Sequence, residues 1–310
     1  MKKVALIIPY FGSWPEWFEL YLYSCSKNKM IDFLFFTDCE IPYKRYSNTF
    51  FQEISFDDYC LRVSQCLQIN FSPLTPRKLC DLKPFYGMIH EKELQDYDFW
   101  GFGDIDLIYG DLSNLINEHM LSRYDVITTH SPHIAGHFTI IRKKSKYTNL
   151  PIQIKGWESA LSNPKVVVFD EGAFSAKVNP LLRLFRFFYF RVNRFFKSDK
   201  YRDCQKFNDL VKWITPHLFF HECYSTVFMR NDANWKYNLQ NGTLEATTGI
   251  LRIPPNEGIT YVHFYLFKDT IQSCGNPCWT NNCYHIPKGY DFEQSSRCVI
   301  VNKDGIALLE

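Results

Sequence analysis

The sequence has little excess of either charge. Its 35 lysines and arginines stand against 33 aspartates and glutamates, for a formal net charge of +2. Proteins that bind nucleic acid through their overall charge usually carry a strongly basic domain. We therefore expect no nucleic-acid partner.

Long apolar runs are also missing. A membrane-spanning helix needs about 20 mostly apolar residues, and no uninterrupted run of about 18 exists. The first apolar run, Val4–Pro9, is too short for a secretory core and has no small-residue cleavage site. We expect no spanning helix and no signal peptide, which favours reduced cysteines in the cytoplasm.

Closely paired cysteines are absent from a chain that has 11 cysteines in all. Cys274, Cys278 and Cys283, with His285 nearby, offer four zinc ligands. Their spacings are looser than the C-x2-C pairs that identify zinc knuckles. We favour free cysteines and leave zinc binding open.

What the chain does contain is enough apolar sequence for a large core, with 46% hydrophobic residues over 310 positions. The runs Lys3–Ile8 and Ile31–Asp38 read as buried strands on either side of a helical pattern, Trp17–Ser26. A further strand is expected over Phe99–Gly103, after a helix over Lys78–Leu94. Alternating strands and helices predict an α/β fold with parallel strands.

The motif with the clearest chemistry is Trp-Gly-Phe-Gly-Asp-Ile-Asp, which ends in Asp104 and Asp106. In an extended segment, residues two apart point to the same side. Ligands of open α/β sheets gather at the carboxyl ends of strands, where this pair stands. Mg²⁺ and Mn²⁺ bind carboxylates together with substrate phosphate oxygens. The pair therefore predicts a site for a divalent metal.

The ordered set of motifs resembles a known group of enzymes. The set is Ile-Ile-Pro-Tyr, Phe-Phe-Thr-Asp, Lys-Leu-Cys-Asp-Leu-Lys-Pro and Trp-Gly-Phe-Gly-Asp-Ile-Asp. It is similar to glycosyltransferase-like proteins of bacterial capsule, exopolysaccharide and O-antigen clusters. It resembles more distantly the DxD superfamily of lipopolysaccharide galactosyltransferases and glycogenin. The resemblance covers residues 3–175 and resumes near 261–268.

The resemblance implies roles for residues at several strand ends. Donor-binding positions are Pro9, Tyr10, Phe11, Thr37, Asp38, Lys78, Asp81, Lys83 and Lys268. His263 corresponds to the late histidine that supplies a third metal ligand in retaining members. Lys268 lies five residues further on, whereas the fuller family pattern has Gly and Lys-Pro-Trp after the histidine. A carboxylate at the start of a helix is an alternative explanation for Asp81.

Candidates for the acceptor side follow the metal motif. His137 begins an expected strand over Gly136–Arg142, and Asp170 and Glu171 follow another over Val166–Phe169. A carboxylate that faces the sugar can take the proton of the acceptor hydroxyl. It can instead stabilise positive charge on the sugar. If the strand continues, only one of the two acids faces the site.

The segment Leu181–Lys197 differs in composition from the rest of the chain. Arg183, Arg186, Arg191 and Arg194 alternate with clustered Phe and Leu. A basic, aromatic helix suits the surface of an anionic membrane. We predict that it docks the protein on the inner face of the cell membrane, where a polyprenyl-diphosphate-linked acceptor would lie. An ordinary packing helix with a basic edge is the alternative.

These observations predict a GT-A-like, Rossmann-like mixed α/β sheet flanked by helices, with a helical basic-aromatic insertion. We expect a nucleotide-sugar-binding core over residues 1–178, the insertion over 179–215, and a C-terminal part over 216–310 that completes the site. The expected activity is Mn²⁺- or Mg²⁺-dependent transfer of a hexose from a nucleotide diphosphate, with UDP favoured by resemblance. A sugar nucleotidyltransferase is one alternative, although Phe11–Trp14 is a poor phosphate loop. A non-catalytic glycan-binding protein is another.

Overall fold

The structure is a computed structural model of the 310-residue chain. It describes residues 2–129, 133–179, 217–220, 226–228, 235–246, 260–264, 283–302 and 304–309. The predicted membrane segment, Leu181–Lys197, lies outside these ranges. The division into three parts at residues 178 and 215 therefore stays a prediction.

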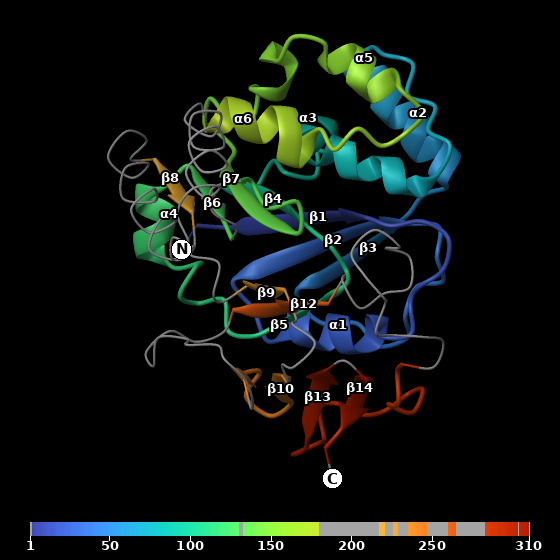
Figure 1. Cartoon of the computed structure of the whole chain (residues 1–310), viewed down its shortest axis with the longest axis vertical. Helices are drawn as coiled ribbons and strands as arrows, with labels where there is room; N and C mark the ends of the chain where they lie inside the picture. Colours follow the sequence, from blue (N-terminus) through green and yellow to red (C-terminus); the bar gives the residue numbers. More distant parts are fainter. Residues whose placement is uncertain are drawn as a thin grey trace, which may run out of the picture.

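A mixed sheet of seven strands forms the centre of the molecule, in the order β3-β2-β1-β4-β7-β6-β8 (Figure 1). The strands β3, β2, β1 and β4 are parallel to one another. Strand β7 is antiparallel to both β4 and β6, and β8 is parallel to β6. The strands are β1 Val4–Pro9, β2 Ile31–Thr37, β3 Thr49–Glu53, β4 Phe99–Gly103, β6 Val126–Thr128, β7 Phe138–Arg142 and β8 Leu218–Phe220. The expected mixed sheet of an α/β fold is confirmed.

Helices cover both faces of this sheet. In Figure 1, α2, α3, α5 and α6 lie above it, and α1 lies below it. The helical segments are α1 Phe18–Ser26, α2 Phe56–Leu67, η1 Pro76–Phe85, α3 Tyr86–Ile89, α4 Glu118–Arg123, η2 Pro151–Gln153, α5 Trp157–Ser162, η3 Asp170–Phe174 and α6 Ser175–Val178. Because both faces are covered, β1 and β4 are buried along almost their whole length, which explains their continuous apolar sequence.

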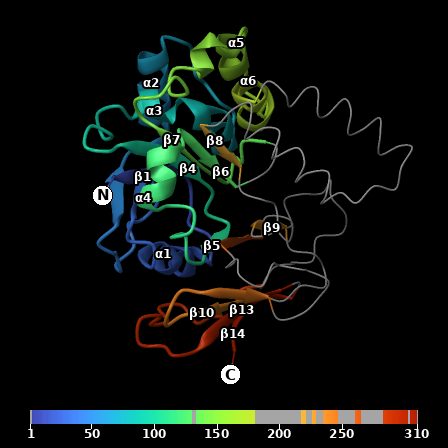
Figure 2. The same cartoon turned by 90° about the vertical axis from the view of Figure 1, so that its left-hand side faces the viewer.

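Two smaller sheets lie on the α1 side of the central sheet. In the figures the first lies beside α1, and the second lies below it (Figures 1 and 2). The first is β5 Leu107–Tyr109, β12 Tyr261–His263 and β9 Thr226–Phe228. The second is β11 Leu244–Ala246, β10 Trp235–Asn238, β13 Cys298–Asn302 and β14 Gly305–Leu308. The second sheet packs on α1 through a shared core, and Tyr23 of α1 donates a hydrogen bond to the carbonyl of Leu239.

Two expected elements are wrong. The helix expected over Lys78–Leu94 is a 3₁₀-helical stretch, η1, followed by one α-helical turn, α3. Pro84 has no N–H to donate, and proline disfavours a continuous α-helix. The strand expected over Val166–Phe169 does not form, and a π-helical turn, η3, begins at Asp170. Asp170 and Glu171 are therefore related by helical rather than extended geometry.

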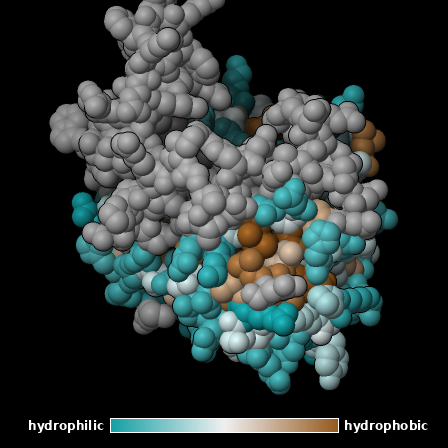
Figure 3. Space-filling view, turned by 60° about the horizontal axis from the view of Figure 1, so that its bottom comes forward, coloured by the Kyte–Doolittle hydropathy of each residue, from teal (hydrophilic) through white to brown (hydrophobic). Residues whose placement is uncertain are grey.

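Much of the described surface on the face in Figure 3 is hydrophilic. Apolar residues gather there mainly in one patch that hydrophilic side chains border. Within the described ranges, every helix is too short or too polar to cross a bilayer.

Candidate metal centre

The acidic motif leaves the sheet at the end of β4, between close neighbours. A Cβ on Gly103 would come within 2.9 Å of the Tyr109 hydroxyl oxygen, so any side chain there would force the buried Tyr109 ring to shift. The N–H of Asp104 donates to the carbonyl of His137 at 3.2 Å, and the indole of Trp17 donates to the carbonyl of Ile105 at 3.0 Å. These contacts fix the backbone on both sides of the turn that carries the two aspartates.

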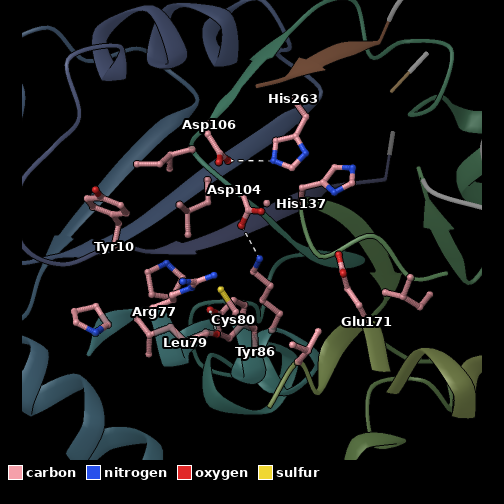
Figure 4. A pocket seen from close by; sticks show the side chains of 18 of the residues that line it. Tyr10, Arg77, Leu79, Cys80, Tyr86, Asp104, Asp106, His137, Glu171 and His263 are labelled. Atoms are coloured by element: carbon pink, nitrogen blue, oxygen red, sulfur yellow. Dashed lines mark hydrogen bonds and ion pairs between the residues drawn. The ribbon is translucent and has the colours of Figure 1, made fainter. Parts of the chain in front are cut away.

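Asp104, Asp106 and His263 meet at one point (Figure 4). Asp106 directly precedes β5, whose Leu107 pairs with His263 in the antiparallel β12. One potential ligand atom from each of the three residues lies within 4.8 Å of the others. The imidazole Nε2 of His263 is 3.4 Å from a carboxylate oxygen of Asp106. Two carboxylates and one imidazole are a donor set that fits a divalent cation such as Mn²⁺.

His137 lies beside this cluster. Its ring stacks on that of His263, with 4.4 Å between the ring centroids and 28° between the planes. Both rings are almost fully buried. His137 therefore fixes one face of the His263 imidazole, in addition to lining the cavity described below.

A buried lysine compensates part of the negative charge. The Lys83 ammonium is 2.5 Å from a carboxylate oxygen of Asp104. Burial lowers the pKa of Lys83, but the Asp104 carboxylate opposes this and the net pKa lies above its usual value. Lys83 thus remains charged at any physiological pH. Burial also raises the pKa of the Cys80 thiol to about 11, so this neighbour stays protonated.

The two acids of η3 occupy different environments. Glu171 lines the cavity, and its carboxylate accepts a hydrogen bond of 3.1 Å from the N–H of Gly136. Asp170 is 3% exposed and lies behind the cavity wall. Burial raises the pKa of Asp170 to about 7, although Lys83 lowers it. A Cβ on Gly136 would lie 2.7 Å from Asp170 and 3.0 Å from Glu171, so both acids depend on this glycine.

A cavity of about 1030 Å³ opens over the cluster. Its walls come from the end of β1, from η1, from the acidic turn and from the start of η3. The expected site residues among its lining are Pro9, Tyr10, Phe11, Lys83, Asp104, Asp106, His137, Glu171 and His263. Tyr10 stacks on Trp14 at 5.0 Å between centroids, which places an aromatic wall at one end. The volume suits a ligand larger than a single sugar.

Four expected donor-binding residues lie elsewhere among the described residues. Thr37 is fully buried, and Asp38 accepts a hydrogen bond of 2.7 Å from the N–H of Gly12. Lys78 and Asp81 form a buried ion pair of 2.8 Å. None of the four lines the cavity, and their assignment to donor contact stays a prediction.

Lys268, Cys274 and Cys278 fall outside the described ranges, whereas Cys283 and His285 fall inside them. The zinc hypothesis therefore stays a prediction. Sequence reasoning missed Arg77, Cys80, Tyr86 and His133, which also line the cavity. Arg77 and Cys80 lie six and three residues before Lys83 in the same helical segment, so they share its side of a 3₁₀ helix. That spacing could have indicated both residues once Lys83 was assigned to the site.

Residues 6–291 match the family described as "Family of unknown function (DUF6625)". The chain belongs to the DUF6625 family. A search of curated proteins found no match to this DUF6625 chain.

Among the solved structures that match the DUF6625 chain, two show only a weak likeness. The first is the apo-form glycosyltransferase GlyE of Streptococcus pneumoniae TIGR4, at 12% identity and a TM-score of 0.32. The likeness covers 73% of the DUF6625 chain but only 46% of the GlyE chain. The second is mouse xyloside xylosyltransferase 1, at 10% identity and a TM-score of 0.35, covering 85% of this chain and 97% of that one. Scores this low carry no argument about activity, which must come from the site itself.

Proposed function

We propose that this protein is a metal-dependent glycosyltransferase that moves a hexose from a nucleotide diphosphate, with UDP as the favoured nucleotide. The observation that carries the proposal is the meeting of Asp104, Asp106 and His263 in one large cavity. A nucleotide diphosphate sugar is a ligand that needs both a cation and room of this size.

The donor set supports Mn²⁺ or Mg²⁺ as the cofactor, and the imidazole of His263 favours Mn²⁺ of the two. Asp104, Asp106 and His263 would hold the ion. A bound divalent cation neutralises the diphosphate as it becomes the leaving group. Lys83 adds a permanent positive charge beside Asp104, where departing phosphate oxygens would gather.

The remaining cavity residues lie at two opposite ends of the cavity. Pro9, Tyr10 and Phe11 form the end at the carboxyl terminus of β1, which we assign to the nucleotide. Glu171 lies at the other end in Figure 4. We assign Glu171, held by Gly136, to the acceptor hydroxyl, as a general base or a positioning group. Asp170 lies behind it and tunes its surroundings, and His137 supports His263.

The proposed acceptor and location rest on the sequence alone. We propose a lipid-linked glycan of bacterial surface polysaccharide synthesis as the acceptor, and the cytoplasmic face of the cell membrane as the place of transfer. The basic and aromatic segment Leu181–Lys197 supports membrane docking. Liposome flotation of wild type and of a Phe187→Ser, Phe188→Ser variant tests this part separately.

The central experiment measures Mn²⁺-dependent binding and hydrolysis of UDP-glucose and UDP-galactose. Asp104→Asn and Asp106→Asn each remove a ligand charge with little change of shape. We expect each variant to lose at least 100-fold in hydrolysis, since second-shell changes alone often cost 10- to 100-fold. Asp111→Asn, an exposed acid seven positions beyond Asp104, is the control and should match wild type. Equal hydrolysis by all four proteins would contradict the proposal.

A further inference from the structure

One residue of the cavity wall has an unusual backbone conformation. Val168 has a φ of +56°, in the left-handed region, where a β-branched side chain is a clear outlier. Among the described residues, the other non-glycine with positive φ is Gln68, which caps the end of α2, a common place for this conformation. Val168 ends no such helix. Its conformation costs free energy that glycine would avoid.

A buried carboxylate holds this strained residue from both sides. Asp81 accepts hydrogen bonds from the N–H of Val167 at 2.9 Å and from the N–H of Phe169 at 2.7 Å. The two donors flank Val168. Asp81 is fully buried, so these charge-assisted bonds are shielded from water and strong.

A buried lysine in turn fixes Asp81. The Lys78 ammonium is 2.8 Å from the Asp81 carboxylate, and it donates to the carbonyls of Ala160 at 2.8 Å and Lys165 at 2.9 Å. Lys78 therefore ties both the carboxylate and the chain before Val168 to η1. Asp81 and Lys78 together form a clamp that over-determines the backbone at Val168.

The clamp holds the backbone of Val168 in a strained conformation, but it does not bury the Val168 side chain. Val168 is 51% exposed and Val167 is 39% exposed, and both line the cavity. A branched apolar residue usually stabilises the fold because its side chain is buried away from water. Val168 is largely exposed, so it contributes little of this stabilisation. Strain that persists beside a cavity, held by buried polar groups, points to use of the side chain by a ligand.

The position of Val168 indicates which part of a ligand it meets. In Figure 4, Tyr10 and Glu171 lie on opposite sides of the group formed by Asp104, Asp106 and His263. Val168 leads directly into η3, and its carbonyl accepts the N–H of Gly172 beside Glu171. A diphosphate at the metal ligands with its base toward Tyr10 directs the attached sugar toward the Val168 side.

We propose that Val168 is a specificity-determining residue whose side chain packs on the apolar C–H face of the donor hexose. Asp81 and Lys78 are its positioning residues, and they act by holding the strained turn. The proposal rests on the proposed function, because it assumes a nucleotide-sugar donor at the metal ligands.

The first test concerns strain and uses the free protein. Val168→Gly should leave Tm unchanged or raise it, because glycine adopts positive φ without penalty. Val167→Gly is the matched control, at a neighbouring valine of similar exposure whose φ is not positive. It should lower Tm, since glycine loses more backbone entropy on folding. A Val168→Gly variant that loses as much Tm as Val167→Gly would overturn the inference.

The second test uses calorimetric titration with UDP, UDP-glucose and UDP-galactose, each with Mn²⁺. Val168→Gly should bind UDP as wild type does, but bind the preferred UDP-hexose about tenfold more weakly, as loss of one or two methyl contacts predicts. Absent UDP binding in wild type would reject the proposed function itself. Intact UDP binding with equal hexose affinities in both proteins would reject the role of Val168 alone. The role of Val168 would also be rejected if wild type binds both UDP-hexoses no better than it binds UDP.

Discussion

At the scale of single residues, the site holds more acid than base. Among the described residues, the carboxylates of Asp104, Asp106, Asp170 and Glu171 lie at or beside the cavity, with two cationic side chains, Lys83 and Arg77. Burial makes this imbalance costly, because a charged carboxylate loses its hydration. Asp170 responds by keeping its proton to higher pH, with a pKa of about 7. The same excess of negative charge would favour binding of a divalent cation.

The raised pKa predicts how stability depends on pH. The unfolded carboxyl titrates near 3.8 and the folded one near 7, so the folded state holds the extra proton between these values. The contribution of Asp170 to stability is therefore greatest below about pH 4 and is lost as pH rises through 7. From pH 5 to pH 8, wild type should lose about 2 to 3 kcal/mol relative to Asp170→Asn.

Urea unfolding in EDTA at pH 5 and pH 8 measures this difference for wild type and Asp170→Asn. Asp111→Asn, at an exposed acid, serves as the control and should follow wild type at both pH values. Parallel pH dependence of wild type and Asp170→Asn would show that the buried carboxyl titrates normally.

At the scale of elements, η1 joins the structural and the functional parts of the site. One side of it carries the buried pair Lys78 and Asp81, and the other carries Arg77, Cys80 and Lys83 into the cavity. A 3₁₀ stretch presents residues three apart on one side. One side of η1 therefore faces the cavity, and the other contacts the residues around Val168.

Removal of one partner from the buried pair should be strongly destabilising. Lys78→Met retains the apolar stem but leaves the Asp81 carboxylate buried without its counter-ion, at a cost of about 3 to 5 kcal/mol. Thermal and urea unfolding measure the loss. Lys44→Met, which breaks two ion pairs of exposed side chains, should give no measurable change. Similar stability of the two variants would contradict a buried clamp.

The sequence predicts some elements well and others poorly, for physical reasons. β1 and β4 are buried on both faces, so their apolar runs are visible without any tertiary information. Val166–Phe169 is equally apolar but forms no strand, because Asp81 takes the N–H groups of Val167 and Phe169. Only the folded chain brings Asp81 to that segment, 86 positions away. Local pattern could not reveal this competition.

At the scale of the whole molecule, the candidate metal ligands come from distant parts of the chain. Asp104 and Asp106 follow the central sheet, whereas His263 arrives on β12 through its pairing with β5. The acidic pair was identifiable from its place after an apolar strand, and His263 only through the ordered set of motifs. No local pattern specifies that β12 pairs with β5, since that pairing is formed by the whole fold.

This arrangement predicts that metal binding stabilises the entire fold. A ligand that binds only the folded state stabilises it by about 2.7 kcal/mol at 100 times its Kd, which raises Tm by about 4 °C for a chain of this size. Mn²⁺ should therefore raise the Tm of wild type, and His263→Ala should lose most of this shift because the remaining ligands lie on one short turn. His285→Ala, at an exposed histidine outside the cluster, should keep the full shift. If instead His285→Ala abolishes the shift and His263→Ala retains it, the ion binds near Cys283 and the site at the end of β4 holds none.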